Sequence, residues 1–132
     1  MKTIKKIGQL SVAMMAIILV VSSCKKAPSG VVISTSTPTI AMGETATITV
    51  EIDGDANWLQ WYFQDPTEPA PDESSGGVIP FDFVLDSATT SLYGPGEYVI
   101  YAEARNCRPA KASTDDCNIK TKSNEIVITV TP

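Results

Sequence analysis

The side chains that could perform catalysis are few in this chain. It contains no histidine, so the commonest general base and the usual partner of a serine or cysteine nucleophile are missing. A carboxylate pair, as in glycoside hydrolysis, needs two carboxyl groups about 5–10 Å apart in a cleft. Glu97 and Glu103 share a predicted strand, but their parity places both toward solvent. We therefore expect no enzymatic activity and no cofactor.

The sequence gives little support for a metal site either. Asp53-Gly54-Asp55 with Asn57, and Asp115-Asp116, are oxygen clusters of the kind that calcium prefers. Aspartate is also common in turns for conformational reasons, and we prefer that interpretation. Two thiols without histidine cannot complete a structural zinc site. No glycine-rich phosphate loop follows a strand into a helix. We predict no metal site.

The first 24 residues have the layout of a secretory signal. Lys2, Lys5 and Lys6 precede an apolar run over residues 7–21, and small residues follow it. The run is shorter than the roughly 20 residues that a helix needs to cross a bilayer. The sequence therefore predicts export rather than a membrane span.

Val21-Ser22-Ser23-Cys24 resembles the lipobox of bacterial lipoproteins. The resemblance implies that the Cys24 thiol is acylated and becomes the mature N-terminus, which makes the membrane a partner of the protein. Residues 1–23 would then be the signal peptide and 24–30 the lipidated cysteine and its polar tether. Lysine rather than aspartate at position 25 favours an outer over an inner membrane and leaves the face open. The alternative is an ordinary cleaved signal and a free domain.

The composition of the exported part excludes one class of partner. Without Lys2, Lys5 and Lys6 the chain keeps 7 Lys+Arg against 15 Asp+Glu, a formal charge of −8. Nucleic-acid binding needs a basic face, so we expect no nucleic-acid partner. Two cysteines remain, Cys107 and Cys117. In an oxidising compartment we expect them to form a disulfide, which would stabilise the fold by roughly 2–3 kcal/mol.

Alternation of apolar and polar residues dominates the exported part and predicts strands. We expect an acidic loop over 64–77. The predicted strands cover 31–35, 44–52, 57–63, 78–85, 89–93, 97–104 and 124–130. Seven short strands in about 100 residues describe an all-β, antiparallel β-sandwich.

Several positions resemble immunoglobulin-like domains. Trp61 stands where these domains have their core tryptophan. Gly96-Glu97-Tyr98-Val99-Ile100 is similar to their Gly-x-Tyr-x-Cys segment, with Tyr98 as the tyrosine-corner residue. Ile48 and Ile100 replace the intersheet cysteines. Tyr93 to Val99 also resembles PKD-type domains of bacterial surface proteins. The resemblance implies a single immunoglobulin-like sandwich over 31–132 and leaves its function open.

Strand parity predicts one aromatic sheet face. Its expected members are Trp58, Tyr62, Tyr101, Val99 and Val127. Exposed aromatic and apolar residues favour a binding surface, whereas cross-strand pairs of the same residues can simply stiffen a sheet. A third possibility is that the loop 64–77 covers this face. Arg105, Arg108 and Lys111 predict a locally basic tip beside the disulfide.

These observations favour a lipid-anchored protein of the cell envelope that binds rather than catalyses. The preferred function is protein–protein contact or adhesion through the immunoglobulin-like domain. A glycan-binding module that uses Trp58, Tyr62 and Tyr101 is an alternative, as is a purely structural envelope subunit. Oligomeric state and the identity of the partner stay open.

Overall fold

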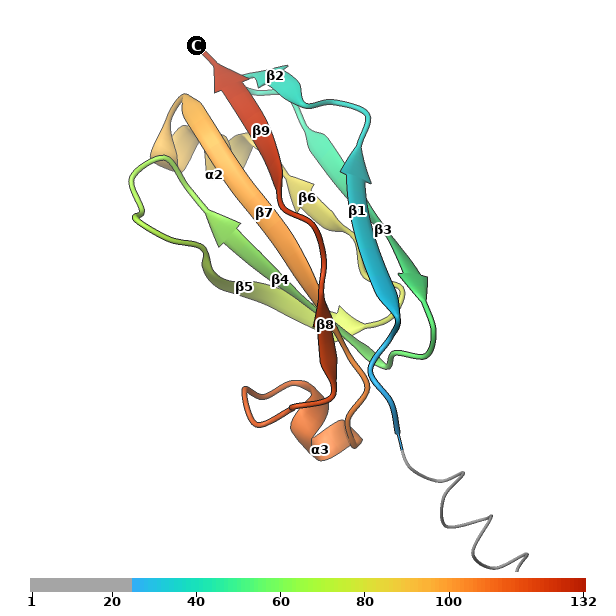
Figure 1. Cartoon of the computed structure of the whole chain (residues 1–132). Coiled ribbons are helices and arrows are strands. Elements are labelled where there is room, and N and C mark those ends of the chain that lie inside the picture. Colours follow the sequence, from blue (N-terminus) through green and yellow to red (C-terminus); the bar gives the residue numbers. More distant parts are fainter. Residues whose placement is uncertain (1–24) are drawn as a thin grey trace, which may run out of the picture.

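The computed structural model describes residues 25–132, in which two β-sheets face each other (Figure 1). One sheet has the strand order β1-β3-β6, and the other has β2-β9-β7-β4-β5 with β8 beside β7. The strands of the first sheet are β1 (Gly30–Thr35), β3 (Ala46–Asp53) and β6 (Phe83–Leu85). Those of the second are β2 (Thr39–Ala41), β4 (Trp58–Gln64), β5 (Asp72–Val78), β7 (Gly96–Arg105), β8 (Lys120–Lys122) and β9 (Ile126–Thr131).

This arrangement confirms the predicted all-β sandwich. Pairing is antiparallel except between β2 and β9, which run parallel. The central part of the second sheet, β9-β7-β4-β5, follows the G-F-C-C′ order of immunoglobulin-like domains. Nine strands are present in the described residues, compared with about seven expected. The sequence did not predict the strands β2, β5 and β8. Both sheets, the core and the disulfide lie within residues 25–132.

The core is built by the alternating side chains of both sheets. Trp61 of β4 is 0% exposed, and Ile48 and Ile100 are equally buried. The indole Nε1 of Trp61 donates to the carbonyl of Phe81 at 2.8 Å. The hydroxyl of Tyr98 donates to the carbonyl of Gly94 at 2.5 Å, as in a tyrosine corner. The two aromatic residues thus fix β4 and β7 to neighbouring loops.

The expected loop over 64–77 is wrong in its second half, because β5 (Asp72–Val78) pairs antiparallel with β4. Its serines and glycines are typical of a loop, but here they make room for larger neighbours. A Cβ atom at Gly76 would collide with the side chains of Gln60 and Trp58. The segment therefore extends the sheet at its edge and does not fold over the face.

The expected strand 89–93 is also wrong, because a short helix, α2 (Ser87–Tyr93), occupies this position. Asp86 caps the helix, since its carboxylate accepts from the backbone N–H of Thr89 at 3.1 Å. This bond and the one from the Thr89 hydroxyl lower the pKa of Asp86. The helix ends at Gly94, whose φ of 86° favours glycine.

The expected strand 78–85 is shortened to Phe83–Leu85. Pro80 interrupts it, because proline has no N–H to donate to a sheet. A second helix, α3 (Pro109–Ala112), lies between β7 and β8. Within the described part of the chain, no helix has the length and apolar character needed to cross a membrane.

Candidate functional site

Four of the five residues predicted for the aromatic face lie together on the outer side of the second sheet. Tyr62 of β4 is the register partner of Tyr101 of β7, and their rings stack with centroids 4.6 Å apart. Val99 of β7 is paired with Val127 of β9, which is 45% exposed. We call these four residues the sheet face.

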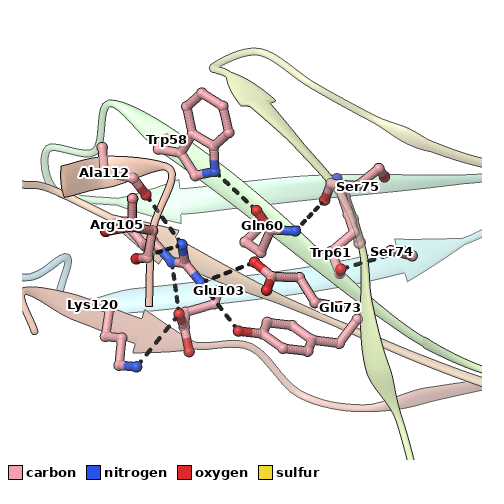
Figure 2. Close-up of polar contacts among 12 residues, drawn as sticks. Trp58, Gln60, Trp61, Glu73, Ser74, Ser75, Glu103, Arg105, Ala112 and Lys120 are labelled. Atoms are coloured by element: carbon pink, nitrogen blue, oxygen red, sulfur yellow. Dashed lines mark hydrogen bonds and ion pairs between the residues drawn. The ribbon is translucent and has the colours of Figure 1, made fainter. Parts of the chain in front are cut away.

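Trp58 belongs to a different cluster. It is half-buried and packs, like Ile119, against the cluster formed by the disulfide and Ala112. Its indole Nε1 donates to the side-chain oxygen of Gln60 at 3.1 Å (Figure 2). The expectation that Trp58 is part of an open binding surface is therefore wrong, because the residues around the disulfide cover this end of β4.

Lys122 of β8 occupies one side of the Tyr101 ring, with its Nζ 4.1 Å from the ring centroid. Tyr62 stacks on Tyr101 from β4, and β4 and β8 flank β7 on opposite sides. Both faces of the Tyr101 ring are thus in contact with neighbouring side chains. The same Nζ lies 3.2 Å from the carboxylate of Glu125.

The disulfide between Cys107 and Cys117 is formed, as the sequence predicts. It closes a loop over residues 107–117, which we call the disulfide loop and which contains α3. In this loop Ala112 is buried, whereas Arg108 and Lys111 are exposed. The bond therefore closes a folded-back segment at one end of the second sheet.

Arg105 is the most unusual residue of this region, because its side chain is 0% exposed. Its Nε donates to Glu103 at 2.8 Å, and a terminal nitrogen donates to the hydroxyl of Tyr62 at 3.1 Å (Figure 2). The other terminal nitrogen donates to the carbonyls of Ala112 and Thr114 at 3.2 and 3.1 Å. Arg105 thus connects β7, the sheet face and the disulfide loop.

Two sequence expectations are corrected by this arrangement. Arg105 is not part of an exposed basic tip, and Glu103, expected in solvent, is only 8% exposed. Both side chains do point outward from the sheet, as parity predicts. Arg105 is buried because the disulfide loop folds back over it, and the side chain of Glu103 lies against Arg105 and Lys120. Glu73 of β5 adds a second carboxylate 3.6 Å from Arg105, and Lys120 lies 3.7 Å from Glu103.

The charges of this cluster shift several pKa values. Burial raises the pKa of Tyr62, and the negative charge of Glu103 raises it further, while the hydrogen bond from Arg105 opposes the shift. Burial also raises the pKa of Tyr101, against the effect of Lys122. For Arg105, burial alone would lower the pKa, but the hydrogen bond and charge of Glu103 outweigh it and raise the pKa.

We expect the tyrosines of the folded chain to ionise at higher pH than those of the unfolded chain. Burial raises the pKa of Tyr62, Tyr98 and Tyr101 above the ordinary value of 10.0. Folding therefore favours the neutral phenols, and this stabilisation is present below pH 10.0 and lost as the pH rises through the folded-state pKa values. Tyrosinate absorbance of native and urea-unfolded protein measures the difference. Coincident titration curves would contradict the burial of these rings.

Among the residues considered for calcium, Asn57 has another role. The side-chain amide of Asn57 donates to the carbonyl of Cys107, and Asp115 and Asp116 are exposed. Within residues 25–132 no three side chains of the His, Cys, Asp and Glu types come together as a possible metal site.

The segment that precedes β1 is hydrogen-bonded to the domain. The side-chain amide of Asn106 donates to the carbonyl of Lys26 at 2.8 Å, and the hydroxyl of Thr121 donates to that of Pro28 at 2.6 Å. The ammonium of Lys25 donates to the carbonyl of Cys107 at 3.3 Å. The chain therefore enters the domain beside the disulfide loop (Figure 1). Cys24 and the predicted signal peptide 1–23 lie outside the described residues.

The comparisons with known proteins concern the fold. No protein-family model matches the chain, and no curated protein matches it significantly. Among solved structures, a match occurs in one described as the structural basis of T cell specificity and activation by the bacterial superantigen toxic shock syndrome toxin-1. The two chains are 17% identical with a TM-score of 0.51, over 77% of this chain and 100% of the other. At this identity the likeness supports the β-sandwich alone.

Proposed function

We propose that this protein is a lipid-anchored component of the bacterial cell envelope whose immunoglobulin-like domain binds another protein without catalysis. The single observation that carries the binding role is the sheet face. Tyr62 and Tyr101 present a stacked aromatic pair, and the partly exposed Val99 and Val127 continue it as a small apolar surface. Aromatic residues supply large contact area at protein interfaces and keep a polar tip.

Protein contact is a better match to this face than sugar stacking. A sugar ring needs a free aromatic face, whereas the two sides of the Tyr101 ring are in contact with Tyr62 and Lys122. The rigid pair and its aliphatic neighbours instead suit a flat protein surface. The proposed lipid anchor rests on the Val21-Ser22-Ser23-Cys24 sequence. Lys25 and Pro28 are hydrogen-bonded beside the disulfide loop, so acyl chains on Cys24 would hold this end of the domain near the membrane.

Replacement of Cys24 by alanine should move the protein from the membrane fraction to the soluble envelope or culture fraction. The reason is that the Cys24 thiol is the proposed site of the acyl chains that hold the protein at the membrane. Fractionation followed by immunodetection measures the shift, and the mass of the mature N-terminal peptide tests acylation directly. Ser23→Ala serves as the control and should remain membrane-bound. Retention of the Cys24→Ala variant would exclude this anchor.

Replacement of Val127 by aspartate should abolish capture of the partner protein in a pull-down that uses the domain 25–132 as bait in envelope extract. A buried carboxylate without a partner is strongly unfavourable at an interface. Val32→Asp is the matched control, because Val32 is 56% exposed on the opposite sheet and Val127 is 45% exposed. Proteins captured by the wild type and the Val32 variant but lost from the Val127 variant support the proposal. Equal capture by all three would contradict a binding role for the sheet face.

A further inference from the structure

A second surface of the domain, separate from the sheet face, is a groove at the open side of the sandwich. It has a volume of about 420 Å³ and lies between β5, β6 and α2. Its aromatic floor is formed by Phe63, Phe83 and Tyr93, with ring centroids 5.9 Å apart for Phe63–Phe83 and 6.1 Å for Phe63–Tyr93. Leu92 and Val84, which are 74% and 48% exposed, stand at its rim.

The groove runs along an unpaired strand edge. The strand β6 pairs with β3 on one side, from Ala46↔Leu85 to Ile48↔Phe83, and has no partner on its other side in residues 25–132. The second wall is formed by Ser74 and Ser75 of β5, which is itself the last strand of its sheet. An open strand edge beside an apolar groove is the geometry that accepts an additional strand, since backbone hydrogen bonds and alternating side-chain pockets are both available.

The charges around the groove indicate which kind of segment it can bind. Exposed Asp82 and Asp86 stand immediately before and after β6, and β5 begins with the exposed Asp72. Within residues 25–132 none of Asp72, Asp82 and Asp86 forms an ion pair with a lysine or arginine. An incoming strand therefore meets apolar surface in the middle and negative charge at both ends.

The same charges disfavour a second copy of this chain as the occupant. If two β6 strands paired antiparallel about Val84, Asp82 of one copy would lie opposite Asp86 of the other. Like charges directly opposite each other in a sheet are destabilising. The partner that fits is a different protein.

We propose that this groove binds an extended segment of another protein, with alternating small aliphatic side chains and flanking lysine or arginine, as a fourth strand along β6. Its backbone pairs with Phe83–Leu85, its aliphatic side chains lie on the aromatic floor, and its cationic flanks approach Asp82 and Asp86. The inference depends neither on the lipid anchor nor on the sheet face.

The test uses the domain 25–132, which contains both sheets, the core and the disulfide. Three synthetic peptides serve as probes. The first has an alternating Val/Thr core with lysine at both ends, the second has the same core with glutamate ends, and the third has lysine ends and a central proline. We expect binding of the first alone, weakened by salt, with slowed amide hydrogen exchange in Phe83–Leu85.

Two matched variants separate the groove from a general effect of charge. Leu92→Lys removes an exposed apolar rim residue, and Val78→Lys adds the same charge at a position of nearly equal exposure outside the groove, 72% compared with 74%. Both should fold normally, because surface substitutions rarely change stability much. We expect Leu92→Lys to weaken peptide binding by about tenfold, corresponding to the loss of one buried leucine, and Val78→Lys to change it less than twofold.

Several results would overturn the proposal. These are equal binding of the lysine- and glutamate-flanked peptides, equal loss in the two variants, unchanged exchange in β6, or no binding at millimolar peptide. A concentration-dependent dimer that Leu92→Lys abolishes would assign the groove to a second copy of the chain, which also overturns it. None of these outcomes bears on membrane release by Cys24→Ala or on capture through Val127, so the two proposals fail separately.

Discussion

Replacement of Arg105 by methionine should lower the free energy of unfolding by about 3–5 kcal/mol, because it leaves the buried carboxylate of Glu103 with only the partly exposed Lys120, 3.7 Å away, as a charged partner. Glu103 is only 8% exposed and would lose the donor that lies 2.8 Å from its carboxylate. The carbonyls of Ala112 and Thr114 would each lose a hydrogen bond from the same side chain. Urea denaturation of the wild type and the variant measures the difference.

Two control variants test whether the loss of stability comes from the buried, unpaired carboxylate rather than from the loss of a positive charge. The double variant Arg105→Met/Glu103→Leu removes both charges together, so it should recover much of the stability that the single variant loses. Lys122→Met removes a cation from the exposed pair with Glu125, whose side chains are each 52% exposed. It should cost at most about 1 kcal/mol. A loss below 1 kcal/mol for Arg105→Met would mean that this network does not hold the disulfide loop on the sheet.

The Arg105 cluster also shows what strand parity can and cannot predict. Parity places Tyr62, Tyr101, Glu103 and Arg105 on the outer side of the second sheet, and the structure agrees. Parity contains no information about what covers that side. The disulfide loop reaches Arg105 through the carbonyls of Ala112 and Thr114, and backbone carbonyls have no sequence signature. The burial of Arg105 was therefore not predictable, and neither was the contact of Trp58 with the disulfide.

Other errors come from signals that were present but ambiguous. The run Ser74-Ser75-Gly76-Gly77 is typical of a loop, yet here small residues accommodate Gln60, Trp58 and Phe81 in a paired strand. Thr89 and Thr90 favour a strand by their β-branching. Asp86 three residues before Thr89, with Gly94 behind the segment, is a capping signal that could have indicated α2. The groove beside β6 depends on both segments, and so it could not be predicted from the sequence.

Replacement of Trp61 should have a similarly large effect on stability, because this residue lies at the centre of the sandwich with 0% exposure. Its ring is tilted against that of Phe83 with centroids 5.7 Å apart. Its Nε1 also donates to the carbonyl of Phe81 at 2.8 Å. We expect Trp61→Ala to lower the free energy of unfolding by about 3–5 kcal/mol, the range found when a large core aromatic leaves a cavity. Denaturant unfolding followed by far-ultraviolet circular dichroism measures the change.

Trp61→Phe separates the two contributions of this residue. Phenylalanine keeps most of the apolar volume but cannot donate to Phe81, so the partly buried carbonyl of Phe81 is left without its partner. Loss of a buried hydrogen bond costs about 1–3 kcal/mol, and we expect Trp61→Phe to fall in this range, below the loss for alanine. Trp58→Phe is the matched control, because Trp58 is half-buried and packs against the smaller disulfide cluster outside the main core. The two tryptophans lie only three residues apart on β4, but Trp61 points into the core between the sheets and Trp58 packs against the disulfide cluster. An equal loss of stability for Trp58→Phe and Trp61→Phe would therefore contradict a central role for Trp61.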